Sequence, residues 1–137
     1  MALSLPPVPS WEREFGISWK KWLIKLRDLL IHGENVQTPT LLNSWVNYGS
    51  TYRTAGYWKD IQGQVHLVGM VAGGTPSSGS VVFTLPEGYR PSKDEIFVSV
   101  GNAAFAEIIV RSSGNVIIVV GSGTWTSLSG ITFKAAQ

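Results

Sequence analysis

The sequence predicts a mainly β protein, an antiparallel β-sandwich of the jelly-roll kind, preceded by one amphipathic α-helix. From Trp45 onward no helical period remains, and β-branched and aromatic residues dominate the apolar positions. Short runs of these residues alternate with turn signals rich in Gly, Pro and Ser, a pattern typical of a sandwich. Before Trp45, only the stretch 18–32 carries apolar residues at a convincing helical spacing.

Composition limits the classes of function that the chain can serve. Its 137 residues suffice for one domain with an appendage, and the absence of Cys excludes disulfides and Cys-ligated zinc. The net charge of +2 is balanced and the basic residues are scattered, so we expect no nucleic-acid partner. Charged residues make up only 15%, against roughly 25% in typical domains, which favours a surface covered by partners. We expect neither a signal peptide at the start nor a membrane span.

The N-terminal part begins with a Pro-rich segment, 1–10, that we expect to be extended. A helix is predicted over 18–32, with Ser18 as its N-cap and Gly33 just past its end. One face of this helix forms an apolar stripe that we expect to mediate oligomer formation or virion attachment. The stripe consists of Trp19, Trp22, Leu23, Leu26, Leu29 and Leu30. A basic, Trp-bearing helix could instead lie in a membrane surface, but packing against protein is favoured because part of the stripe also fits a heptad pattern.

After a linker over 33–44, eight strands are predicted. They cover residues 45–48, 52–59, 64–72, 80–85, 95–100, 105–111, 115–120 and 127–133. The chain therefore divides into an N-terminal attachment segment, 1–44, and a β-sandwich head, 45–137.

Two of these strands are apolar on both faces, namely 64–72 and 116–120. A sandwich of this size has one core, so a second apolar face needs another cover. A neighbouring copy of the chain is the simplest cover, and it would make the protein a symmetric oligomer. The alternative is that the strands are central and well buried.

Residues for catalysis or metal binding do not form a recognisable pattern. His32 and His66 stand alone, and the acidic residues are scattered. The segment "GTPSSGS", 74–80, has the glycine spacing of a phosphate loop but lacks its Lys and opens no helix. We therefore expect no enzyme activity, no cofactor and no metal.

Three segments in order resemble the C-terminal head domains of bacteriophage tail fibres and receptor-binding proteins. They are "YRTAGYWKDIQGQVHLVGMVAGGT", "VVFTLPEGYRPSKDEIFVSV" and "SSGNVIIVVGSGTWTSLSGITF". The resemblance covers about two thirds of the chain. The matching residues look like framework rather than receptor contacts: Tyr57, Trp58, Lys59, Asp60, Val65, His66, Leu67, Gly69, Leu85, Pro86, Gly88, Tyr89, Arg90, Pro91, Leu128, Gly130, Ile131 and Phe133.

The resemblance implies a homotrimeric virion protein, made in the host cytoplasm. It would be a short tail fibre that is attached to a tail or baseplate protein through residues 1–44. The head would recognise a host-surface receptor, a glycan or a protein, and Trp125 and the loop 75–80 are candidate contacts. The alternatives are a purely architectural adaptor or decoration protein and, less favoured, a polysaccharide-degrading enzyme. The sequence does not identify the host, the receptor or the anchoring tail protein.

Overall fold

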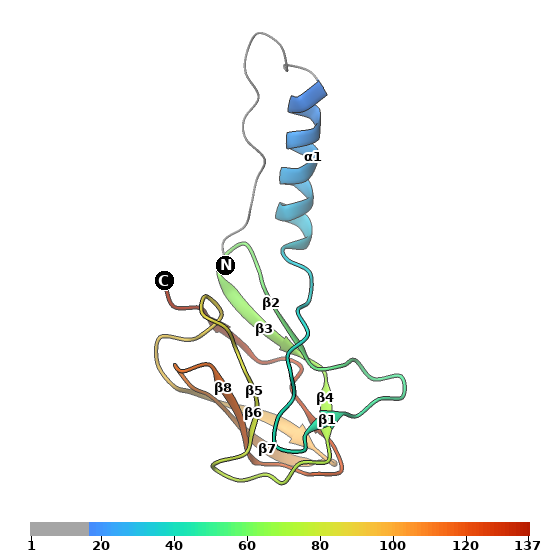
Figure 1. The fold of residues 1–137 in the computed structure, drawn as a ribbon, viewed down its shortest axis with the longest axis vertical. Coiled ribbons are helices and arrows are strands. Elements are labelled where there is room, and N and C mark those ends of the chain that lie inside the picture. Colours follow the sequence, from blue (N-terminus) through green and yellow to red (C-terminus); the bar gives the residue numbers. More distant parts are fainter. Residues whose placement is uncertain (1–16) are drawn as a thin grey trace.

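The computed structural model describes residues 17–137, in which one helix stands at one end of a body of β-strands (Figure 1). The helix, α1, spans Ile17–His32 and ends at Gly33, whose φ of 65° suits the left-handed residue that terminates many helices. The predicted helix is thus confirmed to within one residue. The expected Pro-rich start over 1–10 lies outside the described residues, as do the side chains of Ser18, Leu29 and His32.

The strands form two antiparallel sheets, which confirms the mainly β, sandwich-like fold. The larger sheet has seven strands in the order β1-β4-β9-β6-β7-β8-β5, and the smaller has three in the order β10-β3-β2. In chain order the strands are β1 (Val46–Asn47), β2 (Gly56–Lys59), β3 (Gln64–Val68), β4 (Met70–Ala72), β5 (Val81–Thr84), β6 (Glu95–Gly101), β7 (Ala104–Val110), β8 (Asn115–Val120), β9 (Thr126–Ser127) and β10 (Thr132–Lys134).

Two predicted strands, 64–72 and 127–133, are each broken in the structure and contribute to both sheets. The first breaks at Gly69, whose φ is 107° and whose position leaves no room for a Cβ against the backbone of Thr54 and Ala55. The second breaks between β9 and β10, where Leu128 N donates to the Gly69 carbonyl at 2.8 Å. The two breaks therefore lie side by side and form a common corner at which the chain passes from one sheet to the other.

Two further strand predictions were too long. The predicted strand 52–59 begins only at Gly56, because residues 48–54 form a loop that projects from the side of the body (Figure 1). The predicted strand 45–48 reduces to Val46–Asn47. Trp45 instead turns into the core, where it is 2% exposed.

One core lies between the sheets. Its largest buried side chains are Trp45, Phe83, Leu67, Leu85, Ile108, Ile118 and Leu128. Tyr57 stacks near Phe83 and meets the ring of Tyr89 edge to face, with ring centroids 5.1 Å apart in the second pair. Most of the large buried side chains thus come from strands that the hydrophobic pattern predicted.

The tripeptide Tyr89-Arg90-Pro91 forms a corner after β5. Gly88 has a φ of 89°, and Tyr89 N donates to the Pro86 carbonyl at 3.2 Å. Arg90 Nε donates to the Leu85 carbonyl at 2.8 Å, so the guanidinium holds the loop backbone. The residues of the resemblance are buried or half-buried, apart from Pro86 and Gly130, which fits a framework role.

The two strands expected to need a covering subunit are better shielded than the sequence suggested. Val116, Ile117 and Ile118 are all buried within the chain, because the loop before β5 folds along β8 and Ser77 N donates to the Ile118 carbonyl. Along 64–72, the second face is half-buried at Val68 and Met70. The strongly exposed apolar face lies on β6 and β7 and continues onto Val120, which is 42% exposed at the end of β8.

The predicted linker runs along the sandwich on its way from α1 to β1 (Figure 1). Gln37 pairs with Tyr57 in an isolated antiparallel bridge, and Leu42 N donates to the Val82 carbonyl at 2.8 Å. Leu41 packs against the core. The division into an attachment segment and a head at residue 44 stays a prediction.

Candidate functional site

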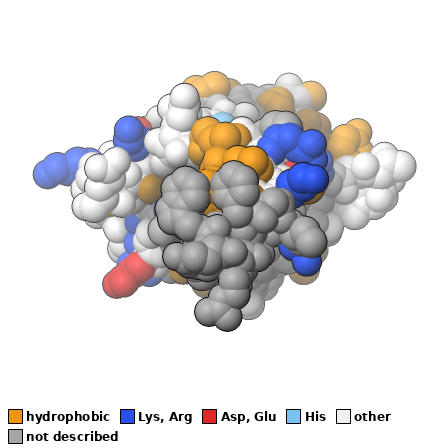
Figure 2. Space-filling model, turned by 90° about the horizontal axis from the view of Figure 1, so that it is seen from above, with side chains coloured by type: hydrophobic (Ala, Val, Ile, Leu, Met, Phe, Trp, Pro, Cys, Tyr) orange, Lys and Arg blue, Asp and Glu red, His pale blue; other side chains and the backbone are white. Residues whose placement is uncertain are grey.

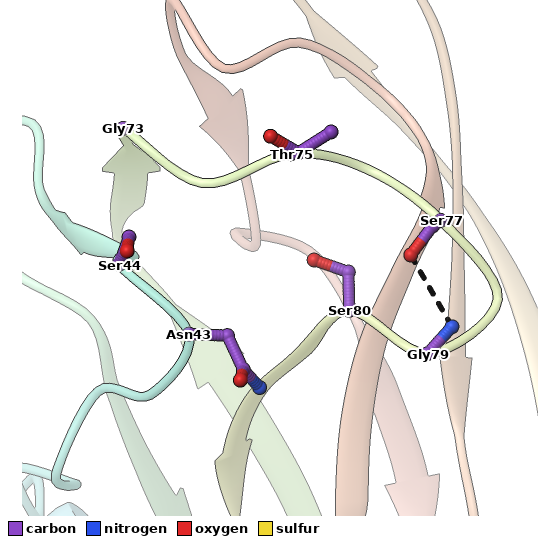
Figure 3. Close-up of a pocket in the computed structure, with 7 residues that line it drawn as sticks. All are labelled: Asn43, Ser44, Gly73, Thr75, Ser77, Gly79 and Ser80. Carbon is purple, nitrogen blue, oxygen red and sulfur yellow. Dashed lines mark hydrogen bonds between the residues drawn. The ribbon is translucent and has the colours of Figure 1, made fainter.

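A polar cavity of about 330 Å³ lies at the end of the molecule opposite α1 (Figures 1 and 3). The loop 73–80, between β4 and β5, forms one side of it, and the end of the linker forms the other. Its lining residues are Asn43, Ser44, Gly73, Thr75, Ser77, Gly79 and Ser80. The volume falls at the lower end of the range of small-ligand sites, roughly 300–1,000 Å³.

The floor of this cavity is held from below by Trp45. The indole Nε1 donates to Ser80 Oγ at 2.8 Å, and both groups are buried. Gly74 lies directly against the indole ring, where a Cβ would come within 2.2 Å of a ring carbon. Because the Ser80 hydroxyl accepts from Trp45, its own hydrogen is left to donate toward the cavity.

The linker side of the cavity has an unusual backbone. Asn43 and Ser44 are consecutive non-glycine residues with φ of 54° and 66°. Such left-handed conformations cost free energy and are concentrated at functional sites and tight turns. Asn43 Nδ2 donates to the Val81 carbonyl at 2.9 Å, which fixes this rim to the start of β5.

Hydrogen bonds within the loop 73–80 hold its rim in place. Ser80 N donates to the Ser77 carbonyl at 3.0 Å, and Gly79 N donates to Ser77 Oγ at 3.4 Å, the contact drawn in Figure 3. Thr75 and Ser77 are exposed at the opening. The lining therefore offers hydroxyls, an amide and backbone groups but no charged side chain, which suits a neutral ligand that carries several hydroxyl groups.

The structure brings Trp125 near this site without placing it in the cavity. The loop 121–125 adjoins the loop 73–80, since Gly73 N donates to the Gly123 carbonyl at 2.7 Å. Trp125 is half-buried and is not among the lining residues. Its role as a receptor contact stays a prediction. Asn43 and Ser44 were not predicted as site residues, because they fall in the predicted linker. The available signal was Asn43 itself, since Asn adopts the left-handed backbone conformation more readily than most residues.

His66 belongs to a polar row across the smaller sheet. Its Nε2 lies 2.9 Å from Asp60 Oδ2, its Nδ1 lies 3.1 Å from Thr132 Oγ1, and its ring stacks on Trp58 at 4.3 Å. An acid, an imidazole and a hydroxyl in a row also occur in hydrolases. Here Asp60 Oδ1 in addition accepts from the backbone N–H of Gln62 and Gln64, so the row fastens the β2–β3 hairpin.

A second polar contact joins the helix end to the sandwich. Tyr89 Oη donates to Glu34 Oε2 at 2.7 Å, and Lys59 Nζ lies 4.9 Å from the centroid of the Tyr89 ring. Glu34 Oε1 is buried and has no hydrogen-bond partner among the described residues. A cavity of about 450 Å³ lies nearby, between the linker and the β5 corner, and Thr38, Pro39 and Arg90 contribute to it.

The stripe of α1 is partly exposed. Trp19 and Trp22 meet edge to face with ring centroids 5.2 Å apart, and both are half-buried, as is Leu26. Leu23 and Leu30 are more than half exposed. Viewed from above, with α1 end-on, hydrophobic side chains gather beside Lys and Arg side chains (Figure 2).

Within residues 17–137, no helix is long and apolar enough to cross a membrane. No group of three or more His, Asp or Glu side chains in this range could hold a metal ion.

The fold and the site define a class of protein: a small β-sandwich that carries a helix at one end and a neutral polar cavity at the other. The chain is similar in fold to a solved structure, the crystal structure of the receptor binding protein (gp15) of Listeria phage PSA. It matches with a TM-score of 0.61 and 24% sequence identity, over 94% of this chain and 82% of that chain. At this identity, the likeness establishes a common fold. Comparisons with protein-family models and with curated proteins gave no match.

Proposed function

We propose that the chain is a receptor-binding protein of a phage virion, attached to the tail by its helix end and directed at the host by its opposite end. The observation that carries this proposal is the fold shared with a phage receptor-binding protein over 94% of the chain. The residues that resemble tail-fibre heads are almost all framework residues, which supports the same assignment.

The positions of the two candidate sites agree with this assignment. Helix α1 and the loop 73–80, which lines the polar cavity, lie at opposite ends of the molecule (Figure 1). A protein held at one end would present the other to the cell surface. The cavity at that far end is lined by uncharged hydroxyl and amide groups, so a neutral cell-surface glycan is its proposed ligand.

The stripe of α1 is the proposed attachment surface. A helix of 16 residues is marginal alone in water, so contacts with other chains would stabilise it. Three helices could bundle around a threefold axis, or each could dock on a tail protein; both agree with a homotrimer.

The test of receptor binding blocks the cavity without disturbing the fold. A Cβ at Gly79 meets nothing within 4 Å, so Gly79→Phe should fill the opening at little cost in stability. Purified protein with this change should bind host cells at least tenfold more weakly than the natural chain. Ser78→Phe is the matched control, because it adds the same ring to the neighbouring exposed residue, which does not line the cavity.

Equal binding by the natural chain and Gly79→Phe would exclude the cavity as the receptor site. If the natural chain were found in virions but bound no host cells, the protein would instead be an architectural adaptor.

A further inference from the structure

The β6–β7 face of the larger sheet is an apolar surface that the head leaves open. Its exposed side chains, in register across the sheet, are Ile96, Val98, Val100, Phe105 and Val120. Val98 is 76% exposed and Ile96 is 67% exposed, although both lie in the middle of the longest hairpin. Five such side chains expose a few hundred Å², about the largest apolar patch that monomeric proteins tolerate.

A second exposed apolar set lies on a different part of the same sheet. The loop that leaves β1 projects from the side of the body (Figure 1), and it carries the edge-to-face pair Tyr48 and Tyr52. Val46, at its base, is 55% exposed, and Tyr52 is 53% exposed. We call residues 46–54 the arm.

The two surfaces carry single charges of opposite sign. Arg53 is the one charged residue of the arm, and Glu107 is the one charged residue between Ile96 and Val110. Glu107 lies in the middle of the apolar face, paired with Val98 on one side and Val120 on the other. Neither Arg53 nor Glu107 takes part in an ion pair within residues 17–137.

The arm and the face do not meet within one chain. β4, β9 and β6 lie between β1 and β7 in the sheet, so the two strands are four spacings apart, roughly 19 Å at about 4.8 Å per spacing. A contact between Arg53 and Glu107 therefore requires two chains. Stable contacts between proteins bury roughly 800 Å² on each partner, so an arm-on-face contact would cover the polar borders of both surfaces as well as their apolar side chains.

From these observations we infer that the arm of one copy docks on the β6–β7 face of the next, with Tyr48 and Tyr52 on the apolar side chains and Arg53 beside Glu107. Because the two surfaces differ, the contact is head-to-tail and can close into a ring. This inference rests on the homotrimer in the proposed function, and it identifies the surfaces that join the copies.

Charge reversal tests the pairing. Arg53→Glu and Glu107→Arg should each raise the dissociation constant of the oligomer at least tenfold, measured by sedimentation of the full chain. The double variant should return to within about threefold of the natural value. Lys93→Glu, an exposed reversal outside the arm and the face, is the control and should change nothing. Circular dichroism and thermal melting of each variant would show that it still folds.

Val98→Asp, together with the charge reversals, tests whether the arm or another surface covers the β6–β7 face. Its side chain is exposed, so the change should leave folding intact and dissociate the oligomer. A different result is that Val98→Asp dissociates the oligomer while Arg53→Glu combined with Glu107→Arg fails to restore the natural dissociation constant. That result would exclude the arm as the occupant and indicate that two β6–β7 faces meet directly. If none of these changes alters the dissociation constant of the oligomer, the inference is wrong.

Host-cell binding, measured on the same preparations, separates this inference from the proposed function. A natural chain that fails to bind cells but shows the rescue pattern would refute the receptor role and leave the interface standing. If the chain binds cells through the cavity but charge reversal does not change the dissociation constant of the oligomer, the receptor role stands and the proposed interface is wrong.

Discussion

At the scale of single residues, Tyr89 ties the helix end to the sandwich. Its hydroxyl donates to Glu34 just after α1, and its ring packs against Tyr57 inside the core. Burial raises the pKa of the Tyr89 phenol, and the hydrogen bond to Glu34 and the negative charges of Glu34 and Tyr57 raise it further. The neutral phenol is therefore the form that the fold requires.

Replacing Tyr89 should weaken the fold and change its alkaline limit. Tyr89→Phe leaves the Glu34 carboxylate without its donor, so we expect a loss of about 1–3 kcal/mol in the free energy of unfolding at neutral pH. A raised folded-state pKa means that the contribution of Tyr89 is fully present below its unfolded pKa, about 10, and is lost as the pH rises above it. Urea unfolding between pH 7 and 11 would measure both effects.

Tyr52→Phe is the control for this experiment, because Tyr52 is exposed and its hydroxyl makes no hydrogen bond within residues 17–137. Equal stability of Tyr89→Phe and the natural chain at neutral pH would contradict the proposed role of the hydroxyl.

Asp60 should determine how the stability of the β2–β3 hairpin falls at acid pH. Burial alone would raise the pKa of its carboxyl, but the hydrogen bonds from His66, Gln64 and Gln62 outweigh this and hold the pKa below its usual value. The stabilisation is then present above about pH 3.8 and lost as the pH falls through the lower folded-state pKa. Asp60→Asn should cost about 1 kcal/mol at neutral pH and flatten this acid dependence in urea titrations.

Asp28→Asn offers a comparison for Asp60. Asp28 pairs with Arg27 at 3.3 Å on the exposed side of α1, where such pairs contribute little. A similar loss in both variants would mean that the Asp60 network has no special role in the fold.

At the scale of elements, the corner between the two sheets depends on Gly69. A Cβ there would lie 2.4 Å from the Thr54 carbonyl oxygen, and its φ is positive. Gly69→Ala should therefore cost at least about 3 kcal/mol, from backbone strain and forced separation of packed backbone. Gly63→Ala shares the positive φ but meets nothing within 4 Å, so it should cost only about 1 kcal/mol. Chemical denaturation of both variants measures the difference, and equal losses would contradict the steric account.

The stripe of α1 allows a test of attachment at this same scale. Leu23→Gln combined with Leu30→Gln removes two exposed apolar side chains, and we expect at least a tenfold fall in the amount of protein incorporated into virions. Lys20→Gln, on an exposed part of the same helix, should leave incorporation unchanged. Quantitative immunoblotting of purified particles would measure both; full incorporation of the double variant would exclude the stripe.

Helical periodicity and β-forming composition were enough to predict the helix and the long strands. The helix carries apolar residues at a 3.6-residue period, and β6 and β7 are rich in the β-branched and aromatic residues that strands favour. The corner was missed because "VHLVGMVA" and "TSLSGITF" each look like one strand with a glycine inside. The breaks arise from contacts with each other and with residues 54 and 55, which are remote in sequence.

The candidate site was predictable only in part, for a similar reason. The loop 75–80 stood out by its polar, flexible composition. The cavity, however, forms only because Asn43 and Ser44 come to lie opposite that loop, and no local pattern encodes a meeting across that distance. The exposure of β6 and β7 was equally hidden, because these strands carry apolar residues on both faces and their sequence does not show which face the chain itself covers.

At the scale of the whole molecule, association should appear in the stability of the protein. If copies bind one another when folded, the melting temperature rises with protein concentration. We expect calorimetry between about 1 and 100 µM to show a clear upward shift of the midpoint. A midpoint that does not depend on concentration would show that each chain unfolds as an independent monomer.

The indole beneath the cavity has a consequence for variation of the proposed receptor site. Trp45 fixes Ser80 and the close approach of Gly74, so these positions tolerate little variation. Between them, Thr75, Ser78 and Gly79 are exposed, so new side chains there would face solvent. Mutants selected on resistant bacteria should therefore accumulate changes at these three positions while keeping the tryptophan below them.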